Sequence, residues 1–210
     1  KTAYEILSGL VGSEMCIRDS SEVRGQLAGD ACSILMKDLW LARLGRPDIQ
    51  KPVCDLATKI QCWSKNEDKR VERLMGYLWD TRDYKLIGQI LDKVEDLGLS
   101  LHVDADFCGD SDTTRSTNGG WLRLTGPKGT SVPLAWVVKR ESATSRSTTE
   151  SEVVALAYSY SLYHEAIPTL DLWCLILGRP VSLTIYEDNQ ATIKTVSYTQ
   201  LRAHETREER

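Results

Sequence analysis

The stretch Leu101–Asp110, with the sequence LHVDADFCGD, constrains the fold of this chain more than any other stretch. An apolar approach is followed by two carboxylates, Asp104 and Asp106, and then by a polar exit that contains a glycine. Residues i and i+2 of an extended strand share a face, so both acids would project in the same direction from a sheet. Two carboxylates at one place repel each other unless a cation lies between them. The stretch therefore predicts a strand whose end is either exposed to solvent or faces a cation.

Apolar side chains recur at helical spacing between residues 21 and 82, and the pattern then changes to that of strands. In the first part, one helix is expected to end at Gly45, a second to begin near Pro47, and a third to follow the capping-box sequence Ser64-Lys65-Asn66-Glu67. Further along, strands are predicted at 85–91, 99–104, 121–124, 134–138 and 181–186, with helices after Ser147, at 170–177 and from about 188 to 196. This order predicts an α/β fold preceded by a small helical subdomain.

Composition narrows the possible classes of function. The net charge of −4 argues against a stand-alone nucleic-acid binder, but it allows an enzyme that meets phosphates through metal ions bound by clustered acids. No apolar run approaches the ~18 residues that a membrane span needs. Six cysteines at irregular spacings, without a C-x-x-C pair, indicate thiols in a reducing compartment, and no segment has the pattern of a signal peptide.

Three acids lie at the ends of predicted elements and could converge in the fold. Asp104 is on a strand, Glu152 is in the second turn of a helix, and Asp188 is at the carboxyl end of another strand. Three carboxylates together suit two divalent cations, ~3.5–4 Å apart, that clamp a phosphodiester. Mg²⁺ or Mn²⁺ prefers such oxygen ligands. In such a site one ion activates water as the nucleophile and the other stabilises the leaving 3′ oxygen.

Four short sequences, in this order, resemble the ribonuclease H domain of copia-type LTR retrotransposon polyproteins. They are His102–Phe107 (HVDADF), Arg115–Gly119 (RSTNG), Ser147–Leu156 (STTESEVVAL) and Ile185–Gln190 (IYEDNQ). Two upstream sequences resemble the helical segment that links reverse transcriptase to ribonuclease H in the same polyproteins, namely Arg46–Ile49 (RPDI) and Met75–Asp83 (MGYLWDTRD). The resemblance covers roughly residues 25–196.

The resemblance implies a ribonuclease H-like mixed sheet flanked by helices, which cleaves the RNA strand of an RNA–DNA hybrid during reverse transcription with two Mg²⁺ (or Mn²⁺) ions. Asp104 matches the first catalytic aspartate of the family, Glu152 the glutamate and Asp188 the second aspartate, so these residues would be both catalytic and metal-binding. The implied partners are the hybrid and the reverse-transcriptase domain of the same polyprotein, with no membrane. The implied location is intracellular, either cytoplasmic in a virus-like particle or nuclear.

Glu150 and Glu152 must be told apart, because residues two apart on a helix point about 200° from each other. Glu150 occupies the N3 position of a capping box, where its carboxylate would bond the backbone N–H of Ser147. Glu152 precedes the apolar run, as the family's glutamate does, and we assign it to the site. Supporting or structural roles are predicted for three further polar residues of these sequences: Asp106, Ser116 and Asn189.

The expected domains are an adapter-like, disordered segment at 1–20, a helical connection at 21–83, a ribonuclease H-like domain at 84–196 and a second adapter-like, disordered segment at 197–210. Both end segments look like translated cDNA-library adapter sequence. The family expects a further acid or histidine on a C-terminal segment, whereas here the tail begins soon after Asp188 and its His204 is assigned no role. We therefore expect a domain truncated at its C-terminus with impaired cleavage. The alternative is an inactive structural or connecting fragment of a polyprotein.

Overall fold

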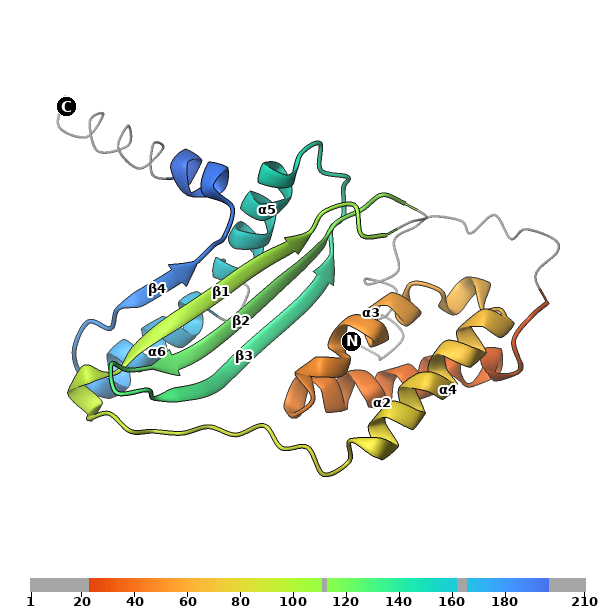
Figure 1. Ribbon diagram of the computed structural model, residues 1–210, viewed down its shortest axis with the longest axis horizontal. Helices are drawn as coiled ribbons and strands as arrows, with labels where there is room; N and C mark the ends of the chain where they lie inside the picture. The colour runs from red at the N-terminus through yellow and green to blue at the C-terminus, as the bar shows by residue number, and fades with distance from the viewer. Residues whose placement is uncertain (1–22, 111–112, 162–165, 197–210) are drawn as a thin grey trace. The chain divides into compact units, whose positions relative to one another are not determined.

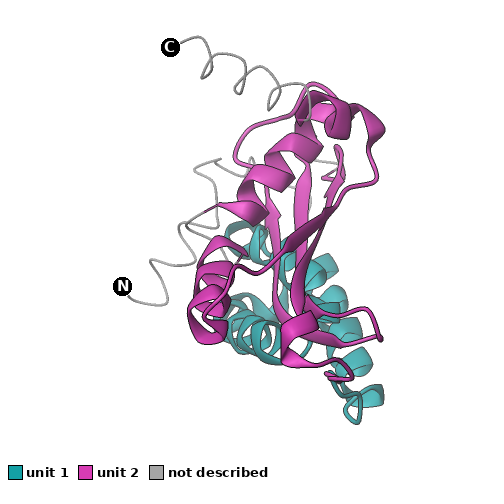
Figure 2. Ribbon diagram, turned by 90° about the vertical axis from the view of Figure 1, so that its left-hand side faces the viewer, with its two compact units in different colours: residues 1–86 teal, residues 87–210 magenta. Residues whose placement is uncertain are grey.

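The computed structural model describes residues 23–110, 113–161 and 166–196, and the chain divides into a first unit at 1–86 and a second at 87–210 (Figure 2). We call them the helical unit and the α/β unit after the elements that they contain. Each unit has its own hydrophobic core. The segments 1–20 and 197–210, for which the sequence predicts disorder, lie outside the described residues.

The helical unit confirms the three predicted helices. Its elements are η1 (Gln26–Gly29), α2 (Ala31–Leu44), η2 (Pro47–Ile49), α3 (Gln50–Ala57), η3 (Ile60–Cys62) and α4 (Lys65–Asp80) (Figure 1). Gly45 follows the end of α2, and Pro47 begins the 3-10 turn that leads into α3. Before α4 the capping box is formed. The hydroxyl of Ser64 accepts a hydrogen bond from the N–H of Asn66 (3.1 Å), and the carboxylate of Glu67 accepts one from the N–H of Ser64 (3.0 Å).

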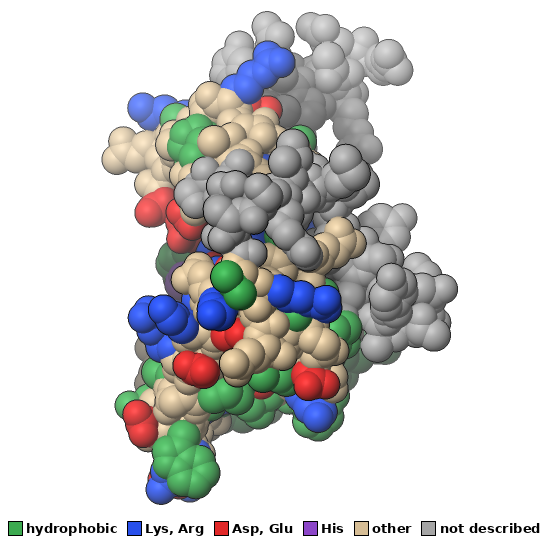
Figure 3. Space-filling view, turned by 90° about the vertical axis from the view of Figure 1, so that its right-hand side faces the viewer, with side chains coloured by type: hydrophobic (Ala, Val, Ile, Leu, Met, Phe, Trp, Pro, Cys, Tyr) green, Lys and Arg blue, Asp and Glu red, His purple; other side chains and the backbone are tan. Residues whose placement is uncertain are grey.

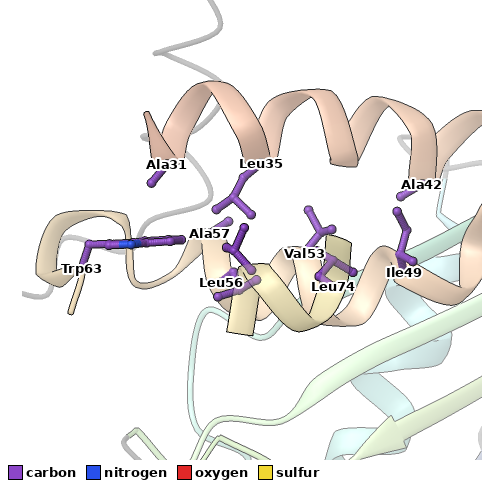
Figure 4. Close-up of a cluster of buried hydrophobic side chains, with 10 residues drawn as sticks. Ala31, Leu35, Ala42, Ile49, Val53, Leu56, Ala57, Trp63 and Leu74 are labelled. Atoms are coloured by element: carbon purple, nitrogen blue, oxygen red, sulfur yellow. The ribbon is translucent and has the colours of Figure 1, made fainter. Parts of the chain in front are cut away.

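The core of this unit lies where the inner faces of the three helices meet. It is formed by buried apolar side chains, among them Leu35, Ile49, Val53, Leu56 and Leu74 (Figure 4). Trp63, which precedes α4, packs at the edge of this cluster, and its indole N–H donates a 2.8 Å hydrogen bond to Asp68. The indole is thus buried with its one polar group satisfied.

The α/β unit contains a four-stranded mixed sheet. Its elements are η4 (Val94–Asp96), β1 (Gly98–Asp106), β2 (Thr117–Thr125), β3 (Ser131–Arg140), α5 (Thr148–Tyr160), α6 (Ala166–Leu177) and β4 (Leu183–Tyr186), followed by a helical segment at 190–196. The strand order is β3-β2-β1-β4, with β1 antiparallel to β2, β2 antiparallel to β3, and β1 parallel to β4. Figure 1 shows α5 and α6 on the same face of the sheet. The predicted fold class, a mixed sheet flanked by helices as in ribonuclease H-like folds, is confirmed.

The strand predicted at 85–91 is wrong. This segment forms only an isolated bridge, in which the backbones of Gln89 and Ser131 exchange hydrogen bonds of 3.0 and 2.9 Å. Its apolar side chains stay in contact with solvent: Ile87 is 75% exposed and Ile90 is 62% exposed. Alternating apolar side chains favour a strand when one face of that strand is buried. Neither face of this segment is buried, so the alternation did not place the segment in the sheet.

The helix α5 packs closely on the sheet through small residues. Its buried stripe includes Ser151, Ala155 and Ser159, spaced at i, i+4 and i+8. Opposite this stripe, a Cβ atom on Gly120 of β2 would lie 2.5 Å from the hydroxyl oxygen of Ser159. A side chain at position 120 would therefore press on the last turn of α5, and glycine allows this close approach.

The structure corrects the expectation that all six cysteines are free thiols. Cys32, Cys54, Cys108 and Cys174 are free, whereas Cys62 is disulfide-bonded. Irregular spacing along the chain gave no sign of this bond, because spacing in the sequence does not fix which cysteines pair.

Within the described residues, no helix has both the length and the apolar character that crossing a bilayer would require. On the face drawn in Figure 3, Lys and Arg side chains lie among acidic and hydrophobic ones.

Candidate metal centre

The parallel pairing of β1 and β4 brings two of the predicted acids to the same level. In this register Leu99 pairs with Leu183, and the last pair is His102 with Tyr186. The rings of that last pair stack with their centroids 4.4 Å apart. Asp104 and Asp188 each lie two residues beyond it, so they emerge side by side where β4 has ended. Both residues are exposed.

The third acid comes from α5. The hydroxyl of Ser147 caps this helix by accepting the N–H of Glu150 (3.1 Å), and the Glu150 carboxylate accepts the N–H of Arg146 (2.7 Å) rather than that of Ser147 as predicted. Glu150 is exposed, and its carboxylate takes part in the helix cap. Glu152 lies on the buried side of the helix with 7% of its surface exposed. The angular separation of the two residues thus decides which glutamate faces the strands.

Asp104, Glu152 and Asp188 form a group that could hold a metal ion. Each offers one carboxylate oxygen, and these oxygens lie within 4.8 Å of one another. Asp104 and Asp188 face solvent, whereas Glu152 forms the buried wall of the group. Among the residues that the structure describes, this is the one cluster of three or more acidic, histidine or cysteine side chains with such geometry.

The electrostatics of the group call for a cation. Burial raises the pKa of Glu152 to about 7, and the neighbouring charges of Glu187, Asp104 and Asp188 contribute to the rise, against a backbone hydrogen bond from Ala105. Every charged neighbour in this set is an acid. The Oε2 atom of Glu152 is shielded from solvent and accepts no hydrogen bond from any described residue. A divalent cation would supply both the missing partner and the missing positive charge. The all-oxygen donor set suits hard cations.

The predicted supporting residues lie in turns and caps near the group. Asp106 is exposed at the end of β1, opposite Thr117, and is not part of the cluster. Ser116 is fully buried, and its hydroxyl accepts the N–H of Cys108 at 3.3 Å. The amide oxygen of Asn189 accepts two backbone N–H groups, at 3.0 and 3.1 Å, and so caps the helical segment at 190–196. His204 lies outside the described residues.

Glu187 is the residue that sequence reasoning missed. The sequence analysis included it only within the stretch Ile185–Gln190 and gave it no role, yet its charge contributes to the raised pKa of Glu152. Extending the β1–β4 register by one residue places Glu187 level with Val103, which faces the helix-covered core. Successive side chains of an extended segment point to opposite faces. The sequence alone could therefore have placed Glu187 and Asp188 on opposite faces of the sheet.

Two curated proteins are similar to the chain. The retrovirus-related Pol polyprotein from transposon RE1 of Arabidopsis thaliana is 31% identical over 173 residues, which are 82% of this chain and 10% of that protein. The retrovirus-related Pol polyprotein from transposon RE2 of the same plant is 31% identical over 116 residues, which are 55% of this chain and 7% of that protein. No family model matches the chain, and no solved structure does. The chain is thus similar to a region of retrotransposon Pol polyproteins and spans a tenth or less of these relatives.

Proposed function

We propose that this chain is a ribonuclease H-type endonuclease region of an LTR retrotransposon Pol polyprotein, which hydrolyses the RNA strand of RNA–DNA hybrids with two divalent cations. The observation that carries the proposal is the cluster of Asp104, Glu152 and Asp188, whose oxygens lie within 4.8 Å of one another although they come from three separate elements. The mixed sheet and the similarity to Pol polyproteins are consistent with it.

The chain's own residues have distinct tasks in this proposal. Asp104 and Asp188 are exposed, so they can bind ions that also touch a phosphodiester approaching from solvent. Glu152 is buried on α5, so it would hold the ions from the side that is shielded from solvent. When bound, Mg²⁺ or Mn²⁺ would activate a water molecule and stabilise the leaving 3′ oxygen. The proposed partners are the hybrid and the reverse-transcriptase region of the same polyprotein, in an intracellular setting.

The test is cleavage of a labelled RNA–DNA hybrid by the full chain in Mg²⁺. We expect the RNA strand to be cut, and Asp188→Asn to abolish cutting, because the amide removes one charge from the ion ligands. Asp171→Asn is the matched control, since Asp171 is exposed on α6 and outside the cluster, and it should cut like the wild type. Failure of the wild type to cut in either Mg²⁺ or Mn²⁺ would favour an inactive structural region of the polyprotein instead.

A further inference from the structure

Glu187 lies beside the metal-binding group without belonging to it. Asp104, Glu152 and Asp188 are the three residues whose oxygens meet within 4.8 Å. Extending the β1–β4 register by one residue places Glu187 level with Val103, which belongs to the same buried cluster as Ala155 of α5. Glu152 lies on the buried side of the same helix, and Asp188 directly follows Glu187 in the chain. Glu187 therefore lies on the side of the sheet that carries Glu152 and next to a member of the group.

The position of Glu187 is fixed by the segment that follows it. Its Oε1 atom accepts the N–H of Asn189 at 3.0 Å, and Asn189 in turn caps the helical segment at 190–196. In that segment Thr192 is fully buried, and its hydroxyl lies 3.5 Å from the backbone carbonyl of Thr149 in the first turn of α5, to which it donates. The turn that carries Glu187 is thus tied to the helix that carries Glu152.

The two glutamates each present an oxygen without a partner. The Oε2 atoms of Glu152 and Glu187 are both shielded from solvent, and neither accepts a hydrogen bond from a described residue. Burying a carboxylate oxygen without a donor is costly, and such groups in native proteins call for an explanation such as an ion. Glu152 and Glu187 each present such an oxygen, and Asp104 and Asp188 are also acids. The site therefore contains four carboxylates, one more than the metal-binding group.

We propose that Glu187 is a fourth acid of the cation site, which strengthens divalent-cation binding by Asp104, Glu152 and Asp188 through its fixed negative charge. This inference rests on the proposed function, because it takes that cluster as a divalent-cation site. Glu187 acts on the cation through its charge and through its neighbour Glu152, and it is a positioning residue rather than a catalytic one. Residues that act behind metal ligands in this way commonly alter metal affinity about 10–100-fold when replaced.

The test is Mn²⁺ binding to the full chain, measured by titration calorimetry and by the electron paramagnetic resonance signal of free Mn²⁺. Glu187→Gln keeps the size of the side chain and an oxygen that can accept the Asn189 N–H, but it removes the charge. We expect its Mn²⁺ Kd to rise about 10-fold. Glu150→Gln is the matched control, because Glu150 is exposed and bonded to the N–H of Arg146, and its Kd should equal that of the wild type.

Melting without metal separates this role from a merely structural one. Removing a charge from a cluster of acids relieves repulsion, so Glu187→Gln should melt at or above the wild-type temperature in EDTA while it binds Mn²⁺ more weakly. Glu187→Asp keeps the charge and should retain more affinity than the Gln variant. An unchanged Kd in Glu187→Gln overturns the inference and leaves the proposed function standing, provided that Asp188→Asn still loses Mn²⁺. Absence of Mn²⁺ binding by the wild type overturns both.

Discussion

Asp48 in the helical unit and Glu152 in the α/β unit have opposite electrostatic surroundings. In the helical unit, Asp48 accepts hydrogen bonds from the guanidinium of Arg46 at 2.8, 3.0 and 3.2 Å and one from the hydroxyl of Tyr77 at 2.8 Å. Arg46 is largely buried and also bonds the carbonyl and hydroxyl of Thr81. The hydrogen bond from Arg46 is the chief cause of a lowered pKa for Asp48. In the α/β unit, Glu152 has acidic neighbours and a raised pKa.

The difference between Asp48 and Glu152 is whether the positive partner of the acid belongs to the chain. The ion pair of the helical unit is complete within the chain, so its charge contributes to the fold. Among the described residues, the charged neighbours of Glu152 in the α/β unit are all acids, so their repulsion is a cost to the fold that binding of a cation would offset. The following predictions test this contrast, starting with the largest effect.

Arg46→Ala should lower the free energy of unfolding of the helical unit by about 3 kcal/mol, because it leaves Asp48 and Thr81 without their partner in a largely buried network. The measurement is urea denaturation followed by hydrogen exchange of peptides from 23–86. Lys51→Ala is the control: it removes an exposed i,i+4 pair with Asp55 and should cost about 0.3–0.5 kcal/mol. Equal losses in the two variants would contradict the view that the Arg46 network is structural.

Divalent cation should stabilise the α/β unit selectively. At a concentration of 100 times its Kd, Mg²⁺ or Mn²⁺ should add about 2.7 kcal/mol to that unit, because it binds the folded cluster and not the unfolded chain. Hydrogen exchange with and without the ion would show greater protection of peptides from β1 and α5 and no change in α2 to α4. Asp104→Asn should remove the effect, and protection that persists in this variant would place the ion elsewhere.

Gly120→Ala should cost about 2 kcal/mol in the α/β unit and weaken metal binding, because its Cβ would press on Ser159 and move α5, which carries Glu152. Thermal melting and Mn²⁺ titration would measure the two effects. Gly76→Ala in α4 is the counterpart in the helical unit: a Cβ there meets nothing within 4 Å, and the change should stabilise by about 0.5–1 kcal/mol. Unaltered Mn²⁺ affinity in Gly120→Ala would show that α5 does not set the site.

The smallest effect is a pair of opposite pH responses in metal-free protein. Glu152 has a folded pKa of about 7, above its ordinary value of about 4.3. Its contribution is therefore fully present below the ordinary pKa and is lost as pH rises through 7. The lowered pKa of Asp48 acts in the other direction: its contribution is present above about pH 3.9 and is lost as pH falls.

Hydrogen exchange of each unit as a function of pH measures these responses. Peptides of the α/β unit should lose protection between about pH 4.5 and 8, and Glu152→Gln should flatten that dependence. Peptides of the helical unit that contain Asp48 should lose protection under acid conditions. A common response of both units would mean that the acids of the cluster are compensated within the chain after all.

Local chemistry in the sequence determined the helix ends of the first unit and the choice between two glutamates. Gly45 and the capping box at Ser64–Glu67 act within one turn of backbone, so no distant contact was needed to read them. Glu150 and Glu152 differ by angle on a helix, and that angle is a property of the helix alone. The alternation that ends at Asp104 likewise predicted a strand, and the structure contains it as β1.

Tertiary structure decided the features that depend on contacts between segments far apart in the sequence. Whether 85–91 joins the sheet depended on an available edge and a buried face, and only Gln89 of this segment forms a backbone bridge. That the charge of Glu187 reaches Glu152 depended on the packing of α5 against the strands. The sequence by itself thus named Asp104, Glu152 and Asp188 as acids at the ends of elements. Only packing, because it removes water and brings charges together, decided that they share one uncompensated site.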